Sequence, residues 1–264
     1  MKRTYHIWVL ALLITLASAV YQRLTGPTYP KHYVTLLDGK AISVTLDRGH
    51  GGESDHPVTV ETNNPNISGR VEWKRYNTND QLASIPMVYA DGILTAQLPH
   101  QPPAGKLQYT LYLTDGKQTF SASTVIRFRG DVPAPVLILH IACMFIGMLL
   151  SARTGLEMFT KEPIYKKLTY LTFIVITIGG MILGPLVLNY AFNEIWTGFP
   201  FGGDITDNKT LVAFLAWGTA AVAVWKSPNP KRYILAAAII TLLVFLIPHS
   251  LWGTELDYST MKTN

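Results

Sequence analysis

Hydrophobic and polar residues follow two different patterns along this chain. From about residue 29 to 131, short segments of alternating apolar and polar residues are separated by turn sequences such as Asp-Gly, Gly-Gly and Pro-Pro-Ala-Gly. From about residue 132 to 252, apolar residues form long runs that are interrupted by short basic or aromatic segments. Alternation with a period of two predicts β-strands, and long apolar runs predict membrane helices.

The alternating region, 29–131, predicts an all-β sandwich of the immunoglobulin or fibronectin type with antiparallel strands. Turn signals separate its segments at the short intervals that are typical of such sandwiches. Alternation places Val71 and Trp73 on the same face of one strand, so we expect Trp73 to anchor the core. A sandwich of this kind indicates a binding or packing module and implies no reaction. The expected strands are 33–37, 41–46, 57–62, 68–76, 84–90, 93–98, 106–114 and 119–128.

The region 132–252 predicts an α-helical transmembrane bundle of four helices. Within the second apolar run, Gly180 and Gly184 have the GxxxG spacing that lets helix backbones approach closely, so we expect this face to pack against a neighbouring helix. The last two runs are shorter than the roughly 20 residues that a span prefers, so their outer ends should lie among polar groups. The expected helices are about 134–151, 168–190, 210–225 and 233–249, and a short tail, 253–264, follows them.

Basic residues predict the orientation in the membrane. Residues 1–28 begin with Lys2 and Arg3 and continue as an apolar run, which fits an N-terminal anchor or a signal segment, and we favour the anchor. These two residues and the basic segments 153–167 and 226–232 fall on one side if the helices alternate, which predicts cytoplasm there. The sandwich and the C-terminus are then outside, and we expect a bacterial inner membrane.

Composition supports a membrane protein and argues against some other classes. Charged residues make up only 15% of the chain and hydrophobic residues 48%, whereas ordinary soluble domains carry about 25% charged residues. The net charge of +5 comes mostly from residues beside the apolar runs, so we expect no nucleic-acid partner. Cys143 is the only cysteine, so no intrachain disulfide stabilises the exported domain.

The segment 189–210 combines aromatic and acidic residues between two apolar runs. Aromatic rings with polar tips favour the boundary between membrane and water, so we expect a loop that lies on the outer membrane surface. Glu194, Trp196, Asp204 and Asp207 are its candidate surface residues. A protein partner is expected to bind through this loop or through the sandwich.

Two histidines near the outer ends of the predicted helices are candidate cofactor ligands. His140 lies in the first apolar run and His249 at the end of the last, and ionisable groups at membrane depth usually face a cavity, a partner or a cofactor. Met144 is four residues after His140 and shares its helix face. Haem b or copper are the cofactors that such ligands take. The simpler interpretation is that both histidines only form hydrogen bonds.

Weaker metal candidates lie elsewhere in the chain. His50 and His56 belong to the segment DRGHGGESDH, which is more simply a glycine-rich loop between strands. Asp204 and Asp207 offer the oxygen ligands that calcium prefers. We instead expect Thr206, Asp207 or Asn208 to cap a helix that begins near Thr210.

No residue pattern predicts catalysis. The sequence has no nucleophile elbow, HExxH, CxxC or P-loop pattern, so we expect no enzyme and name no catalytic residue. We expect a non-enzymatic interaction or assembly subunit of a membrane or envelope complex. The first alternative is a haem- or copper-binding redox subunit that uses His140 and His249. The second is a small-solute transporter component, against which the lack of an internal repeat argues.

Overall fold

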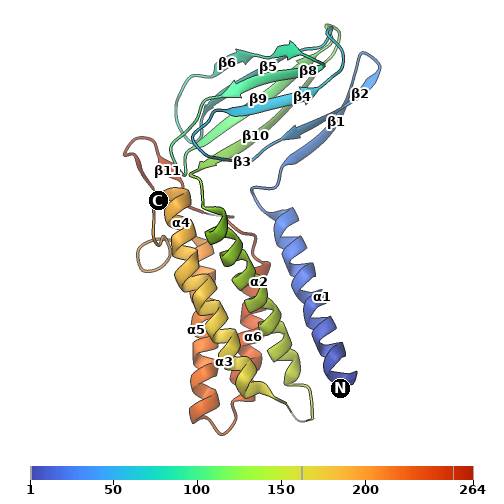
Figure 1. The fold of residues 1–264 in the computed structure, drawn as a ribbon. Helices are drawn as coiled ribbons and strands as arrows, with labels where there is room; N and C mark the ends of the chain where they lie inside the picture. The colour runs from blue at the N-terminus through green and yellow to red at the C-terminus, as the bar shows by residue number, and fades with distance from the viewer. Residues whose placement is uncertain (1, 162, 252, 264) are drawn as a thin grey trace. The chain divides into compact units, whose positions relative to one another are not determined.

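The chain forms a β-rich unit and a helical unit. The structure, a computed structural model, describes residues 2–161, 163–251 and 253–263. The helical unit comprises Met1–Pro27 and Val132–Gly253, and the β unit comprises Thr28–Asp131 and Thr254–Asn264. The fold is therefore mixed, with open sheets in one unit and long apolar helices in the other (Figure 1). Each unit is described by itself below.

Ten strands in the β unit precede residue 131. β1 and β2 form a hairpin, β3-β10-β9-β5-β6 is the order of a five-stranded sheet, and β4-β8-β7 is the order of a three-stranded sheet. The strands are β1 (Lys31–Leu37), β2 (Lys40–Leu46), β3 (Gly49–Gly51), β4 (His56–Glu61), β5 (Ser68–Arg75), β6 (Ala83–Pro86), β7 (Val88–Ala90), β8 (Ile93–Leu98), β9 (Lys106–Thr114) and β10 (Thr119–Arg129).

The structure has strands at all eight predicted segments and differs in three respects. The segment 84–90 divides at Met87, whose N–H donates to the carbonyl of Gly69 at 2.9 Å, so that β6 and β7 belong to different sheets. β3 was not predicted, and it pairs with β10 in parallel, whereas only antiparallel pairs were expected. No tight turn joins β3 to β10, so nothing local requires the antiparallel direction.

The third difference is the C-terminal tail. β11 (Leu256–Asp257) and β12 (Lys262–Thr263) form a small hairpin that belongs to the β unit. The N–H of Leu256 donates to the carbonyl of Ala104 at 3.1 Å, and Lys106 pairs with Glu255 at 2.5 Å. The tail that was expected to be a separate segment therefore packs on the β-rich part of the chain.

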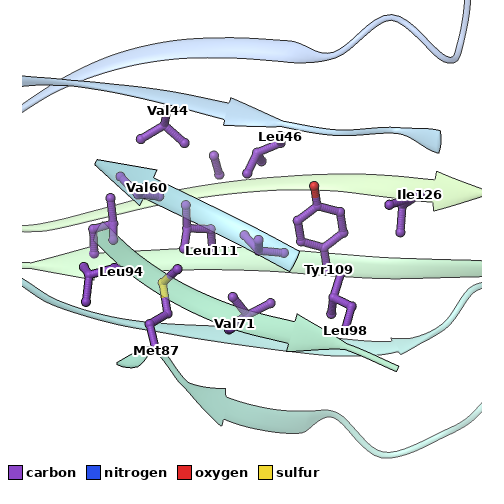
Figure 2. Packing of buried hydrophobic residues seen from close by; sticks show 14 of the residues in the cluster. Val44, Leu46, Val60, Val71, Met87, Leu94, Leu98, Tyr109, Leu111 and Ile126 are labelled. Atoms are coloured by element: carbon purple, nitrogen blue, oxygen red, sulfur yellow. The ribbon is translucent and has the colours of Figure 1, made fainter. Parts of the chain in front are cut away.

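The β unit has one hydrophobic core to which both larger sheets and the β1–β2 hairpin contribute. Alternate residues of β9 are fully buried there, among them Tyr109 and Leu111, and they face Leu94 of β8 (Figure 2). The hydroxyl of Tyr109 donates to the carbonyl of Asp47 at 2.8 Å, so this buried residue has a hydrogen-bond partner for its polar group. Trp73, predicted as a core anchor, is only half-buried and packs against the margin of the cluster.

Among its described residues, the helical unit contains three helices long and apolar enough to cross a membrane, which indicates a membrane protein. They are Tyr5–Thr25, Ala134–Glu157 and Tyr165–Phe192. The third is continuous but has a π-helical turn in its middle. The elements are α1 (Lys2–Thr25), α2 (Ala134–Glu157), α3 (Tyr165–Ile176), η1 (Thr177–Leu183), α4 (Gly184–Phe192), α5 (Ile205–Lys226) and α6 (Lys231–Leu246).

Each predicted helix is present, but α6 ends earlier than expected. It stops at Leu246, and Ile247 is already extended (φ −66°, ψ 122°). The reason is Pro248, because a proline disfavours the helical conformation of the residue before it. His249 therefore lies in a turn after the helix and not at its end.

α1 packs within the helical unit. Its Ala11 and Thr15 are fully buried, and Gln22 donates to the carbonyls of Phe245 and Ile247 at 2.8 and 3.3 Å. These carbonyls lie at the C-terminal end of α6, where helices leave such groups without partners of their own. α1 therefore supplies part of the cap of α6.

Glycines allow the close approach of α2, η1 and α5. A Cβ on Gly179 would lie 2.8 Å from the Cβ of Cys143, and one on Gly180 would lie 2.5 Å from the Cγ2 of Thr210. Gly184, the other half of the GxxxG pattern, has no neighbour closer than 3.7 Å. The expected close packing is therefore formed by Gly180 together with Gly179.

Replacing Gly180 with alanine should destabilise the helical unit. The hydroxyl of Thr210 is bonded to the carbonyl of Thr206 at 2.9 Å, so its methyl group cannot turn away without breaking that bond. Overpacking costs about 1–3 kcal/mol, against about 1 kcal/mol that alanine gains over glycine in a helix. We expect a lower melting temperature, measured with a thiol-reactive fluorogenic dye that reports exposure of Cys143.

Gly203 supplies the matched control. A Cβ added there meets nothing within 4 Å, so Gly203→Ala should leave the melting temperature almost unchanged. Equal melting curves for the Gly180 and Gly203 variants would contradict the packing described above.

Candidate functional site

The connection between α4 and α5 is a loop, residues 193–204, whose backbone is fixed by side chains of the first turn of α5. Thr197 donates from its backbone N–H and from its hydroxyl to Asp207 Oδ2, at 2.7 and 3.0 Å. The N–H of Phe199 donates to Asn208 Oδ1 at 2.7 Å. Polar side chains that were expected on the surface therefore hold the loop in one conformation.

Asp204 begins α5 as its N-cap. It accepts a hydrogen bond from the N–H of Thr206 at 2.7 Å, and its side chain is buried. The prediction that Thr206, Asp207 or Asn208 caps a helix beginning near Thr210 was therefore wrong. The helix begins before the apolar run, because its first turn consists of polar residues whose side chains bond to the loop.

The loop carries exposed apolar side chains at its tip. Ile195, Phe199 and Phe201, the loop tip, are 68%, 69% and 83% exposed. Trp196 is half-buried and donates its indole N–H to the carbonyl of Phe199 at 3.0 Å, so it helps to fix the backbone of the tip. Glu194 is also half-buried. Exposed apolar groups on a fixed backbone are typical of contact with a partner or a membrane surface.

His140 bonds to the π-helical turn. Its Nδ1 lies 2.9 Å from the carbonyl oxygen of Gly179. A carbonyl only accepts, so Nδ1 carries the proton and the neutral ring keeps its lone pair on Nε2. Histidines that bind metals usually donate their other N–H to a carbonyl or carboxylate in this way. His140 therefore has the orientation of a metal ligand. A histidine that only joins α2 to η1 by a hydrogen bond would have the same orientation.

Met144 and Cys143 lie beside the same turn. A Cβ on Gly179 would be 3.0 Å from Met144 Sδ, so the thioether contacts η1 next to the carbonyl that His140 binds. π-helical turns inside α-helices occur frequently at functional sites. The sequence pattern predicted the shared face of His140 and Met144 but gave no signal for the π-helical turn.

Lys209, in the first part of α5, is a buried lysine that sequence reasoning missed. Its side chain is only 4% exposed, and Nζ donates to the carbonyl of Ile247 at 3.1 Å. Lysines are almost never fully buried unless they are paired. Lys209 therefore caps the end of α6 together with Gln22. The available signal was its position directly before a short apolar run.

The other candidates, His249, Asp204 and Asp207, lie in the turn after α6 and at the start of α5, and the N–H of Ser250 joins these two segments by a bond to Thr206 Oγ1 at 3.2 Å. His249 is exposed in the turn after α6. Asp204 and Asp207 serve as helix cap and loop anchor, as described above. Within residues 2–161, 163–251 and 253–263, no three His, Cys, Asp or Glu side chains are grouped so as to hold a metal ion.

In the β unit, the structure brings His50 and His56 together. His50 Nε2 lies 2.9 Å from the carbonyl of Ser54, so this nitrogen donates. The Nδ1 of neutral His50 then accepts from His56 Nδ1, 3.2 Å away. His56 Nε2 is 3.9 Å from Asp47 Oδ2. The two histidines form a hydrogen-bonded chain from His56 through His50 to the carbonyl of Ser54, and the carboxylate of Asp47 lies near His56 without a hydrogen bond to it.

The stability of the β unit should fall in mild acid because of His56. Burial lowers the pKa of His56, His50 lowers it further, and Asp47 acts in the opposite direction. The unfolded chain therefore binds this proton more tightly, and stability is lost as pH falls below about 6.5. We expect the melting temperature of the β unit to decrease between pH 7.5 and 5.5, and His56→Gln to reduce that decrease. Exposed His32 gives the control, His32→Gln, which should keep the full pH dependence; equal slopes in both variants would refute the role of His56.

Comparison with known proteins found no matching family model, no matching curated protein and no matching solved structure.

Proposed function

We propose that the protein is a non-enzymatic interaction or assembly subunit of a membrane complex, with an exported β-sandwich and a membrane-embedded helical bundle. The observation that carries this proposal is the loop tip. Its three apolar side chains stay exposed although hydrogen bonds fix the backbone that bears them. A preorganised apolar surface binds with less loss of conformational entropy than a flexible one.

The distribution of charge supports the exported location of the loop and of the β unit. Exposed basic residues lie at the α2–α3 and α5–α6 connections, among them Lys161, Lys166 and Lys231. With α1, α2, the α3–α4 helix, α5 and α6 crossing in alternation, these connections share the cytoplasmic side with the N-terminus. The α4–α5 loop and residues 28–131 are then outside. We infer a bacterial inner membrane from these short loops.

Two further features support the architecture. The single core shared by the β unit's sheets is what a sandwich of the immunoglobulin or fibronectin type requires. The bonds from Gln22 to the end of α6 support α1 as an uncleaved anchor, because cleavage would remove that cap.

A second surface for the partner is the outward face of the β1–β2 hairpin. Val34 and Leu36 are 72% and 65% exposed, and Leu36 lies opposite exposed Ala41. Within the described residues, β1 pairs with β2 alone, so its other edge is open. Open edges are used for binding extended segments of other chains.

Cross-linking in cells should locate the partner surface. We expect the wild-type protein to co-purify with a partner in a constant ratio, and the partner to be lost from Phe199→Ser/Phe201→Ser or from Val34→Ser/Leu36→Ser. Met261→Ser changes an exposed residue (59%) outside both surfaces and should retain the partner. Retention of every cross-link in both double variants would refute the proposal.

The orientation of His140 favours a second candidate function, a haem- or copper-binding redox subunit. His140 fits a ligand because Nδ1–H is bonded and Nε2 keeps its lone pair, and Met144 offers a soft thioether on the same face. Haem or copper bound there would supply one-electron transfer.

Absorbance spectra of the oxidised and dithionite-reduced protein test this candidate. Under it, the preparation has a Soret band or stoichiometric copper, and His140→Ala loses the signal while the protein stays inserted in the membrane. His32→Ala, in the β unit, should keep the signal. A colourless, metal-free protein from membranes solubilised without chelator would contradict the redox candidate.

A further inference from the structure

The helical unit has an apolar groove between α1, α2 and α6. Its volume is about 210 Å³, and its walls include Ile14, Met148, Ala152, Leu235 and Ile239. The two hydroxyl residues in its lining are buried, and one of them, Thr241, accepts the indole N–H of Trp217 at 2.9 Å. The groove therefore presents a hydrocarbon surface to whatever occupies it.

The length of the groove corresponds to one leaflet of a bilayer. Its wall on α2 runs from Met148 to Leu156, which is about 12 Å at the rise of an α-helix. Half of a hydrocarbon core measures about 15 Å. The lining belongs to the second half of α2 and the middle of α6, so along α2 the groove extends from the middle of the helix toward the basic α2–α3 connection.

The end of the groove at this connection is strongly basic. Phe159, 73% exposed, lines this end, and Lys161 follows two residues later. Lys231 and Arg232 begin α6, four and three residues before Leu235 of the lining, and both are exposed. The three segments that meet this side under the proposed topology, 2–3, 153–167 and 226–232, contain nine Lys or Arg against two Glu.

We propose that this groove binds an anionic phospholipid of the cytoplasmic leaflet, with an acyl chain between α1, α2 and α6 and the phosphate at Lys161, Lys231 and Arg232. An α-helix, about 10–12 Å across, does not enter a groove of this size. Basic groups beside a gap between membrane helices recognise anionic headgroups on the cytoplasmic side. The site does not depend on the partner surfaces discussed above.

Lipid binding to the delipidated full-length protein in detergent tests this proposal. Native mass spectrometry should detect one retained dioleoyl phosphatidylglycerol per chain and weaker retention of dioleoyl phosphatidylcholine. sn-Glycerol 3-phosphate, the headgroup without chains, should neither bind nor raise the melting temperature. Lys231→Gln and Arg232→Gln should each weaken phosphatidylglycerol binding about fivefold and leave phosphatidylcholine binding unchanged.

Filling the groove provides the second arm. Ala152→Phe should abolish retention of both lipids, whereas Val222→Phe, at an exposed position (54%) of α5, should have no effect. Ile239 is half-exposed and lines the groove, so Ile239→Trp gives a fluorophore that brominated phosphatidylglycerol should quench, and Val222→Trp gives its control. The quenching measurement serves if Ala152→Phe does not fold.

Three results would overturn the proposal. The first is equal retention of the two phospholipids by the wild-type protein. The second is equal quenching of the tryptophans at 239 and 222. The third is a delipidated protein whose copies cross-link through position 239, because a second chain would then occupy the groove.

Discussion

The interior of a membrane offers no water to a polar group, so each polar group of the helical unit needs a partner within the protein. The hydroxyls of Thr15, Thr154 and Thr172 donate to the carbonyl four residues earlier in their own helices. Fully buried Trp217 donates instead to Thr241 of another helix. The bond between Trp217 and Thr241 fixes the rotation of α5 relative to α6, which apolar contact alone does not, because it has no direction.

The same constraint acts at the basic end of the unit. Arg153 and Glu157 form an ion pair one turn apart on α2, and both are almost completely buried. The carboxylate also accepts from the N–H of Ile164 at 3.0 Å, and the guanidinium lies 5.3 Å from the ring of Trp8 on α1. A buried charge that loses its partner is strongly destabilising, so this pair restrains α1 and the α2–α3 connection together. α1 is thus held at one end by Arg153 and at the other through Gln22.

Alternation and long apolar runs were sufficient to predict the strands and helices, because a buried face leaves a periodic signal in the sequence. Features that depend on residues far away in the sequence leave no such periodic signal. β3 pairs with β10, 78 residues later in the chain, and the tail packs on Ala104. Lys209 is buried against the carbonyl of Ile247 after α6, and the π-helical turn packs closely on α2 and α5 at Gly179 and Gly180. The sequence therefore predicts the elements well and the site only in part.

The candidate site lies where the N-terminal end of α5 meets the C-terminal end of α6. Polar side chains at the start of α5 bond to the groups around them: Asp204 caps the helix, Asp207 accepts from Thr197 of the loop, and Lys209 donates to the carbonyl of Ile247 after α6. These hydrogen bonds occupy polar groups of the loop, and its apolar side chains remain exposed. The loop tip is consequently rigid and apolar at once. A flexible loop would lose conformational freedom on binding. The backbone of this loop is already fixed by hydrogen bonds before a partner binds, so the tip loses less conformational entropy and is suited to a partner.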